Sequence, residues 1–264
     1  MKSVHQCVRV EASPARGIVF RLMRKKPKKP AKKKPTGNRG STKLASAKGV
    51  GRGTNPERVR LILQKLDEAY PEASCALTHE NPFQLLISTI LSAQCTDVRV
   101  NQVTQTLYRK YPNAKAFAYA NPAELEQDIR PTGFFRNKTK SIMGASKQIV
   151  EELRGEVPRT MEELLKLPGV ARKTANVVLG TAFGIAAGVV VDTHVLRVSR
   201  RLDLTKNTEP KKVEQDLIQI LPREKWILFS HQLIWHGRRV CHARKPKCLE
   251  CNLETICYSK DKTI

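Results

Sequence analysis

The stretch LPGVARKTA at residues 167–175 decides the interpretation of this 264-residue chain. Proline followed by glycine predicts a tight turn, and the residues on both sides are compatible with helices. Gly169 can adopt a positive φ without strain and lets the backbone approach a phosphate closely. A helix starting near Arg172 would present unpaired N–H groups beside this turn, which favours an anion. The stretch therefore predicts a phosphate-binding hairpin, with an ordinary helix–turn–helix corner as the alternative.

A lysine just beyond the turn favours the functional interpretation. Lys173 would lie in the first turn of the second helix, beside Arg172. The positive end of the helix dipole and the neighbouring like charge both disfavour protonation of its amine. A neutral amine is what a Schiff-base nucleophile needs, whereas a lysine that only attracts phosphate needs no such placement.

An aspartate 19 residues further along the chain belongs to the same candidate site. In VDTH at residues 191–194, Asp192 directly precedes a predicted helix over 193–201. Aspartate is a favourable N-cap residue, so capping alone is the alternative explanation. Capping and catalysis are compatible, because a cap holds the carboxylate at a helix mouth where it can stabilise positive charge developing on a sugar.

The charge of the chain points to a polyanionic partner. The formal net charge is +24, and residues 1–54 hold 16 Lys and Arg against one acid, Glu11. The remaining residues still carry a net charge of +9. Nucleic acid is the expected partner, with an anionic membrane surface as the alternative. The best candidate for a membrane span, residues 177–191, has 15 residues where about 20 are needed, so we expect no such span.

Four of the seven cysteines follow the spacing C-x6-C-x2-C-x5-C: Cys241, Cys248, Cys251 and Cys257. This arrangement predicts a tetrathiolate metal site in a reducing compartment and not a disulfide framework. Tetrahedral sulfur suits zinc or an iron–sulfur cluster, and the residues alone leave both open. The first loop of the site is basic, and we expect its Arg244, Lys245 and Lys247 to contact phosphate.

The remaining sequence predicts an all-α protein. Three helix starts pair an Asn N-cap with Pro in the first turn: Asn55-Pro56, Asn81-Pro82 and Asn121-Pro122. Gln84 and Glu124 stand at capping-box positions, and Thr160 with Glu163 predicts a box opening the helix that leads into the hairpin. Residues 83–93 are apolar all round, which predicts a central, buried helix. Alternating β patterns bounded by turns are missing from the sequence, so we expect almost no sheet.

The first 54 residues predict a disordered basic tail, because Lys, Pro, Gly and Ser cannot bury apolar area. An organelle-targeting peptide, or a translation start assigned upstream of a true start at Met23, are the alternatives.

Residues 55–258 resemble the endonuclease III branch of the helix-hairpin-helix DNA glycosylases. The matching stretches are LLISTILSAQCTDVRVN (85–101), TGFFRNKTK (132–140), GEVPRTMEELLKLPGVARKTANVVLGTAFG (155–184), VDTHVLRVSRRL (191–202) and HGRRVCHARKPKCLECNLETIC (236–257). Independent motifs follow one another in the order and spacing of that family. One departure is Ala171, where the family commonly has glycine; alanine fits only if φ stays negative there.

The resemblance implies a mechanism. Lys173 would attack C1′ of the damaged nucleotide as the base leaves, and β-elimination from the Schiff base would cut the strand on the 3′ side. Asp192 would stabilise the oxocarbenium-like state and help to activate the nucleophile. The lesion must leave the base stack first. By resemblance, Gln94 at the end of the buried helix would fill the gap, and Phe134 would wedge the opposite strand. From the residues alone, Gln94 would be a helix-end hydrogen bonder and Phe134 a core residue.

The resemblance also implies the remaining site residues and the cofactor. The hairpin would contact double-stranded DNA through Leu167, Gly169, Ala171 and Arg172. The four cysteines would hold a [4Fe–4S] cluster. The implied fold has two domains: residues 75–185 as a six-helix barrel with the hairpin, and residues 55–74 with 186–258 around the cluster, followed by a tail of residues 259–264.

The expected function is therefore removal of oxidised pyrimidines with cleavage at the abasic site, by a monomer acting without a membrane. The expected location is the bacterial cytoplasm at the nucleoid, or a nucleus or organelle in a eukaryote. One alternative is a mismatch-specific thymine or adenine glycosylase of the same fold. The adenine-removing relatives have glutamate at the position of Ile90 and lack the lysine, which argues against a purely adenine-specific enzyme. The other alternative is a non-catalytic DNA-binding module, against which Lys173 and Asp192 both argue.

Overall fold

Helices make up the regular structure of the chain in the computed structural model, which describes residues 52–264. The predicted tail, apart from its last three residues, lies outside this range. Within residues 52–264 there is no strand, as the sequence predicted. The α-helices are α1 (Pro56–Ala69), α2 (Pro82–Leu91), α3 (Asp97–Lys110), α4 (Ala114–Ala118), α5 (Pro122–Ile129), α6 (Phe135–Glu152), α7 (Met161–Leu164), α8 (Arg172–Phe183), α9 (Thr193–Arg201), α10 (Pro210–Ile220) and α11 (Trp226–Arg239). Short 3₁₀ helices are η1 (Arg130–Thr132), η2 (Arg223–Lys225), η3 (Cys248–Glu250) and η4 (Glu254–Ile256).

The asparagine caps form as predicted. The side chains of Asn55, Asn81 and Asn121 accept hydrogen bonds from first-turn N–H groups of α1, α2 and α5. These bonds satisfy donors that a helix start otherwise leaves open. The capping-box prediction for Gln84 was wrong in detail, because its Oε1 accepts from the backbone N of Glu80, 2.8 Å away, and not from that of Asn81.

The box at Thr160 opens a much shorter helix than predicted. Its hydroxyl accepts from the N–H of Glu163 at 3.3 Å and donates to the carboxylate of the same residue at 2.7 Å. The resulting helix α7 spans only Met161–Leu164, and turns connect it to the hairpin. A single turn of helix has too few internal hydrogen bonds to be stable alone, so packing of buried Leu164 holds it in place.

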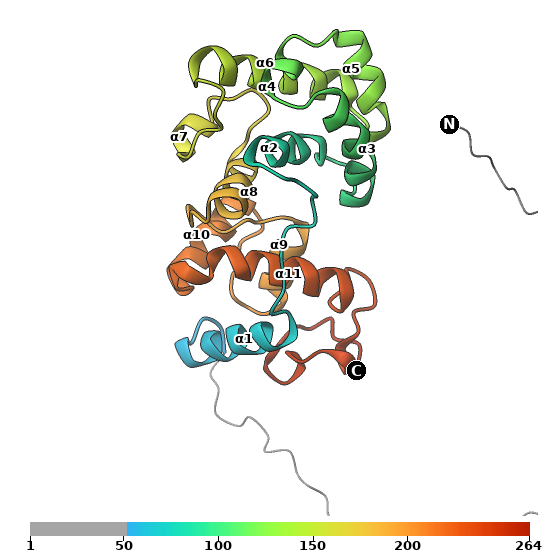
Figure 1. Ribbon diagram of the computed structural model, residues 1–264. Helices are drawn as coiled ribbons and strands as arrows, with labels where there is room; N and C mark the ends of the chain where they lie inside the picture. Colours follow the sequence, from blue (N-terminus) through green and yellow to red (C-terminus); the bar gives the residue numbers. More distant parts are fainter. Residues whose placement is uncertain (1–51) are drawn as a thin grey trace, which may run out of the picture. The chain divides into compact units, whose positions relative to one another are not determined.

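Buried apolar side chains gather in two clusters within the described residues. The first lies among residues 77–179 and the second among residues 59–73 and 189–256. Helix α2 belongs to the first and is buried from Gln84 to Leu91, as its uniformly apolar sequence predicted. It contacts α3, α6 and α8 (Figure 1). The chain thus enters the first cluster after α1 and leaves it after α8.

Helix α1 closes the second cluster against the C-terminal segment. In Figure 1, α1 and α11 lie beside each other, and the two helices are in contact. The fully buried guanidinium of Arg58 on α1 donates to the carbonyl oxygen of Ile256 at 2.8 Å and to that of Leu202 at 2.6 Å. These bonds tie the start of α1 to the ends of α9 and of the cysteine-rich segment. No helix among residues 52–264 is long and apolar enough to cross a membrane.

Candidate functional site

The hairpin turn between α7 and α8 requires glycine at one position. Gly169 has a φ of 77°, and a Cβ built there would lie 2.5 Å from the Cβ of Ser141 on α6. No other residue fits without moving α6. Ala171, the N-cap of α8, has a φ of −94°. Because φ is negative at this position, alanine fits the hairpin where the family commonly has glycine.

The backbone N–H groups of Gly169 and Ala171 have no acceptor among residues 52–264. Ala171 caps α8 without a side-chain acceptor, so no side chain occupies the positive end of this helix. Leu167, by contrast, turns its side chain into the core, with 2% exposed, and its N–H donates to the carbonyl oxygen of Leu164. Among the predicted hairpin contacts, Gly169 and Ala171 are thus better placed for a phosphate than Leu167.

Lys173 and Asp192 line the same pocket, which has a volume of about 90 Å³. Lys173 is exposed in the first turn of α8, and Asp192 is half-buried at the start of α9. The wall also includes Trp235 and an ion pair in which Arg238 donates to Asp97 at 2.6 Å. A primary amine and a carboxylate from separate helix starts therefore face one cavity, which can accept a small polar group.

Asp192 caps α9 as predicted. Its Oδ1 accepts hydrogen bonds from the N–H groups of His194 and Val195, both at 2.8 Å. Both bonds use the same oxygen, which leaves Oδ2 available to the pocket. Burial lowers the pKa of the His194 imidazole, and the charge of Asp192 opposes this shift.

The structure pairs Arg172 with an acid that the sequence did not single out. Its guanidinium meets the carboxylate of Glu214 on α10 with N–O distances of 2.8 and 3.1 Å, and this contact raises the pKa of Arg172. The charge of Arg172 is therefore paired with that of Glu214. The side-chain amide of Asn176 also donates to Glu214, at 2.9 Å. A Cβ at Gly188 would lie 2.1 Å from this carboxylate, so glycine leaves room for the contact.

Three of the predicted DNA-contacting residues have left-handed backbone conformations. The φ values are 54° for Gln94, 48° for Phe134 and 50° for Lys245. Such angles are strained for residues with a Cβ and tend to occur at functional sites. Gln94 is exposed in a turn beyond the end of α2, which stops at Leu91 and not at Gln94 as expected. The side chain of Phe134 is 61% exposed, so the alternative of a core phenylalanine was wrong.

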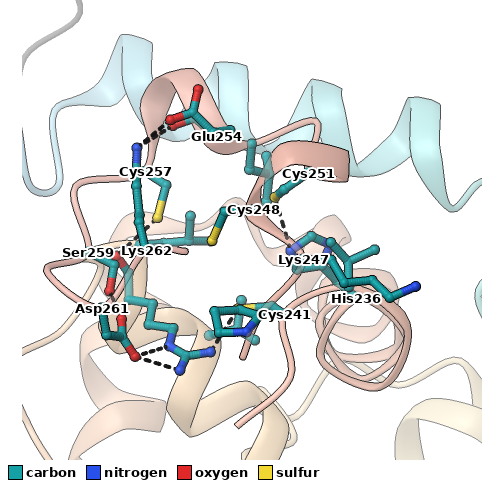
Figure 2. A pocket seen from close by; sticks show the side chains of 16 residues that line it. His236, Cys241, Lys247, Cys248, Cys251, Glu254, Cys257, Ser259, Asp261 and Lys262 are labelled. Carbon is teal, nitrogen blue, oxygen red and sulfur yellow. Dashed lines mark hydrogen bonds and ion pairs between the residues drawn. The ribbon is translucent and has the colours of Figure 1, made fainter. Parts of the chain in front are cut away.

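The four clustered cysteines line one pocket at the C-terminal end of the described chain. Figure 2 shows their sulfur atoms around a common space, together with Lys262 and Asp261. Burial raises the pKa of Cys251 to about 11, and the charges of the other three cysteines add to the shift. If all four lost their protons, they would need compensating positive charge of the kind that a metal centre supplies. Within residues 52–264, no set of three or more His, Cys, Asp or Glu lies close enough to hold a single metal ion.

Nitrogen atoms approach three of these sulfur atoms, and the sulfur of the fourth, Cys257, lies 3.6 Å from the carbonyl oxygen of Arg201. Arg201 Nη1 lies 3.3 Å from the sulfur of Cys241, and His236 Nε2 lies 3.6 Å from that of Cys251. The N–H of Thr263 points to Cys248 at 3.4 Å. Hydrogen bonds of this kind stabilise sulfur ligands in their ionised form. The basic residues of the first loop, Arg244, Lys245 and Lys247, are all exposed, and Lys247 also pairs with Glu250 at 3.4 Å.

Known proteins resemble the chain over most of its length. Residues 87–223 match the family model described as "HhH-GPD superfamily base excision DNA repair protein". "Endonuclease III" of Synechocystis sp. is 59% identical over 201 residues, which are 76% of this chain and 90% of that protein. "Endonuclease III" of Bacillus subtilis is 46% identical over 209 residues, covering 79% of this chain and 95% of that protein.

Two solved structures of endonuclease III are also similar to the chain. A non-covalent endonuclease III–DNA complex superimposes with a TM-score of 0.74 at 45% identity, covering 77% of this chain and 95% of that one. A trapped endonuclease III–DNA covalent intermediate superimposes with a TM-score of 0.73 at 44% identity, with the same coverage of both chains. The helical fold, the hairpin and these likenesses agree with one another. The chain therefore belongs to the endonuclease III family of the helix-hairpin-helix superfamily, and it is a DNA glycosylase and abasic-site lyase of base excision repair.

Proposed function

We propose that this enzyme excises oxidised pyrimidines from double-stranded DNA and cleaves the strand 3′ to the resulting abasic site by β-elimination. The observation that carries the proposal is the shared pocket of Lys173 and Asp192, two residues from separate helix starts. An amine and a carboxylate facing one cavity are the two groups that a glycosylase with lyase activity needs.

In the proposed reaction, the Nζ of Lys173 forms a bond to C1′ of the damaged nucleotide while the bond from C1′ to the base breaks. The C1′–O4′ bond of the sugar ring then breaks, a proton passes from the nitrogen to O4′, and the resulting Schiff base makes the C2′ proton acidic. Loss of this proton and rupture of the C3′–O bond cut the strand. The related endonuclease III whose covalent DNA intermediate was trapped supports a covalent route for this chain.

Asp192 is proposed to stabilise the positive charge that develops on the sugar. Its cap bonds to His194 and Val195 fix the carboxylate, and the second oxygen is free to face the pocket. A charge held before the reaction starts needs no reorganisation during it, which is why fixed groups are effective.

Residues outside this pocket are proposed to contact the DNA. Gln94 would fill the space left by the flipped nucleotide and Phe134 would wedge the opposite strand, since both are exposed and have backbones in strained conformations. The N–H groups of Gly169 and Ala171 would bind a phosphate at the start of α8. Arg244 and Lys245 would add phosphate contacts from the loop between the first two cysteines.

We further propose that Cys241, Cys248, Cys251 and Cys257 hold a [4Fe–4S] cluster. The shared pocket of the four thiols and the groups that approach their sulfur atoms support this assignment. The iron–sulfur cluster, when bound, supplies the positive charge that the thiolates need. It also links the four cysteines to one another across a segment with few helical residues. Arg201 and His236 are placed to donate hydrogen bonds to the sulfur atoms of Cys241 and Cys251.

The division into two domains and the monomeric state are part of the proposal. The two apolar clusters support a barrel domain at residues 75–185 and a cluster domain from residues 55–74 with 186–258. We propose that the enzyme works as a monomer in the bacterial cytoplasm, on the nucleoid.

Borohydride trapping tests the proposed reaction most directly. The enzyme is incubated with a duplex that contains one thymine glycol, and with matched duplexes that contain a thymine or adenine mismatch. We expect a covalent adduct with the thymine glycol duplex alone, and none for Lys173→Gln, which should still bind the duplex. A preference for a mismatch would replace the proposed substrate. Equal losses of binding and trapping in Lys173→Gln would make the lysine a phosphate ligand.

A further inference from the structure

A buried lysine on α6 has no part in the proposed chemistry. Lys138 is 4% exposed, although lysine is rarely buried unless it is paired. Among residues 52–264, no carboxylate lies within ion-pair distance of it. Burial lowers the pKa of Lys138, and the nearby Cys95 opposes this shift. A charge in this position therefore has to be stabilised by dipoles.

Two backbone carbonyl groups provide that stabilisation. The Nζ of Lys138 donates to the carbonyl oxygen of Leu91 and to that of Thr132, both at 2.8 Å. Leu91 is the last residue of α2, and Thr132 is the last residue of η1. Carbonyl groups at helix ends lack intrahelical partners and carry the negative end of the helix dipole. One ammonium thus joins the ends of two helices that belong to different parts of the chain.

Each of these helix ends leads into a strained and exposed residue. Gln94 follows Leu91 by three residues with a φ of 54°, and Phe134 follows Thr132 by two residues with a φ of 48°. A left-handed conformation costs a residue with a Cβ free energy, so it persists only where the surroundings fix the backbone. The bonds of Lys138 fix the backbone just ahead of both residues.

We propose that Lys138 is a positioning residue that holds the turns of Gln94 and Phe134 at a fixed separation, so that both side chains enter the duplex together around the lesion. This inference rests on the proposed function, in which Gln94 fills the space left by the flipped nucleotide and Phe134 wedges the opposite strand. Lys138 itself touches neither the DNA nor the reacting atoms. It acts through the two turns.

The test compares Lys138→Met with Lys140→Met in the full-length, metal-loaded protein. Methionine keeps most of the lysine stem but has no donor, and Lys140 is an exposed lysine on the same helix, so both variants lose one positive charge. The readouts are the ratio of affinities for damaged and intact duplexes, and the fluorescence of a 2-aminopurine beside the lesion, which rises when the base unstacks. For Lys138→Met we expect the ratio to fall about tenfold, as for the loss of about 1.4 kcal/mol, together with a reduced fluorescence signal. For Lys140→Met we expect neither change.

A double-mutant cycle with Phe134→Ala separates positioning from a general loss of stability. If Lys138 acts through the turns, Lys138→Met should add little to the loss of discrimination already caused by Phe134→Ala. Fully additive losses, or normal discrimination in Lys138→Met, would overturn the inference. Lys138→Gln, which keeps amide donors on a shorter stem, serves if Lys138→Met does not fold. Failure of both variants to fold would make Lys138 a core residue and overturn it as well.

The outcome also separates this inference from the proposed function. If Phe134→Ala and Gln94→Ala both leave the fluorescence signal unchanged, then insertion itself is wrong. If these two variants lose the signal while Lys138→Met keeps it, only the role of Lys138 is wrong.

Discussion

Asp192 combines a local and a proposed catalytic role in one carboxylate. Its Oδ1 caps α9, and its side chain lines the pocket that also contains Lys173. The cap could be predicted from the sequence, because an N-cap depends on a residue and its next three neighbours. The shared pocket could not, since it depends on how α8 and α9 are placed in space.

Replacement of Asp192 by asparagine should separate these two roles. Asparagine caps helices as well as aspartate does, so thermal stability should change little. Base excision should slow by at least about 10²-fold, the usual loss when one group that stabilises developing charge is removed. Single-turnover excision of thymine glycol and a thermal melt measure the two effects. Normal excision with normal stability would reduce Asp192 to a cap.

Phe134→Ala should weaken the discrimination of damaged from intact duplex without a large loss of stability. A buried Phe→Ala change costs about 3–5 kcal/mol, and Phe134 is 61% exposed. The matched variant Phe134→Gly should be more stable than Phe134→Ala by about 1 kcal/mol, because glycine relieves the left-handed strain. Denaturant titrations and binding to both duplexes check these expectations. A stability loss of core size in Phe134→Ala would contradict a wedge role.

Helix α8 is held by a contact that links the two apolar clusters. Arg172 and Asn176 on α8 both bond to Glu214 on α10, which is 5% exposed. Lys173 lies next to Arg172, so this contact fixes the first turn that carries the proposed nucleophile. The sequence predicted a helix start near Arg172 but could not reveal the pairing, because 42 residues separate Arg172 from Glu214.

Glu214→Gln should therefore slow Schiff-base formation more than it weakens DNA binding. The neutral amide keeps the shape but loses the charge partner of Arg172, which is itself 43% exposed. We expect a stability loss of only about 1–2 kcal/mol, since solvent screens part of the pair. Glu209→Gln near the start of the same helix is the control, because its pair with Lys212 is exposed. Equal effects of the two changes on trapping would argue against this role.

At the scale of the whole molecule, the proposed iron–sulfur cluster would stabilise the segment that covers one end of the second apolar cluster. The segment from Cys241 to Cys257 contains only two 3₁₀ helices, yet Leu253 and Ile256 are buried in the core. A segment with so few backbone hydrogen bonds of its own depends on other links to stay folded. The fully buried Arg58 supplies one through Ile256, and the four thiols would supply the other.

Protein purified without oxygen should be brown, absorb broadly at about 400 nm and contain roughly four irons per chain with little zinc. Removal of the metal should expose the segment from Cys241 to Cys257 to proteolysis before the helices of the first apolar cluster, because binding and folding of such segments are coupled. Stoichiometric zinc in a colourless, active protein would refute the assignment of an iron–sulfur cluster to the four cysteines. Unchanged protease resistance after metal removal would show that the segment folds without it.

Short-range patterns in the sequence were enough to predict the all-α fold, the asparagine caps, the glycine of the hairpin and the grouping of the four cysteines. Each of these follows from neighbouring residues, whose effects act over a few positions along the chain. The packing of the helices, by contrast, sets which helix ends meet. It paired Arg172 with Glu214, placed Lys138 between Leu91 and Thr132, and brought Lys173 and Asp192 to one pocket. Such contacts join residues far apart in the chain, and their partners depend on how the two apolar clusters pack.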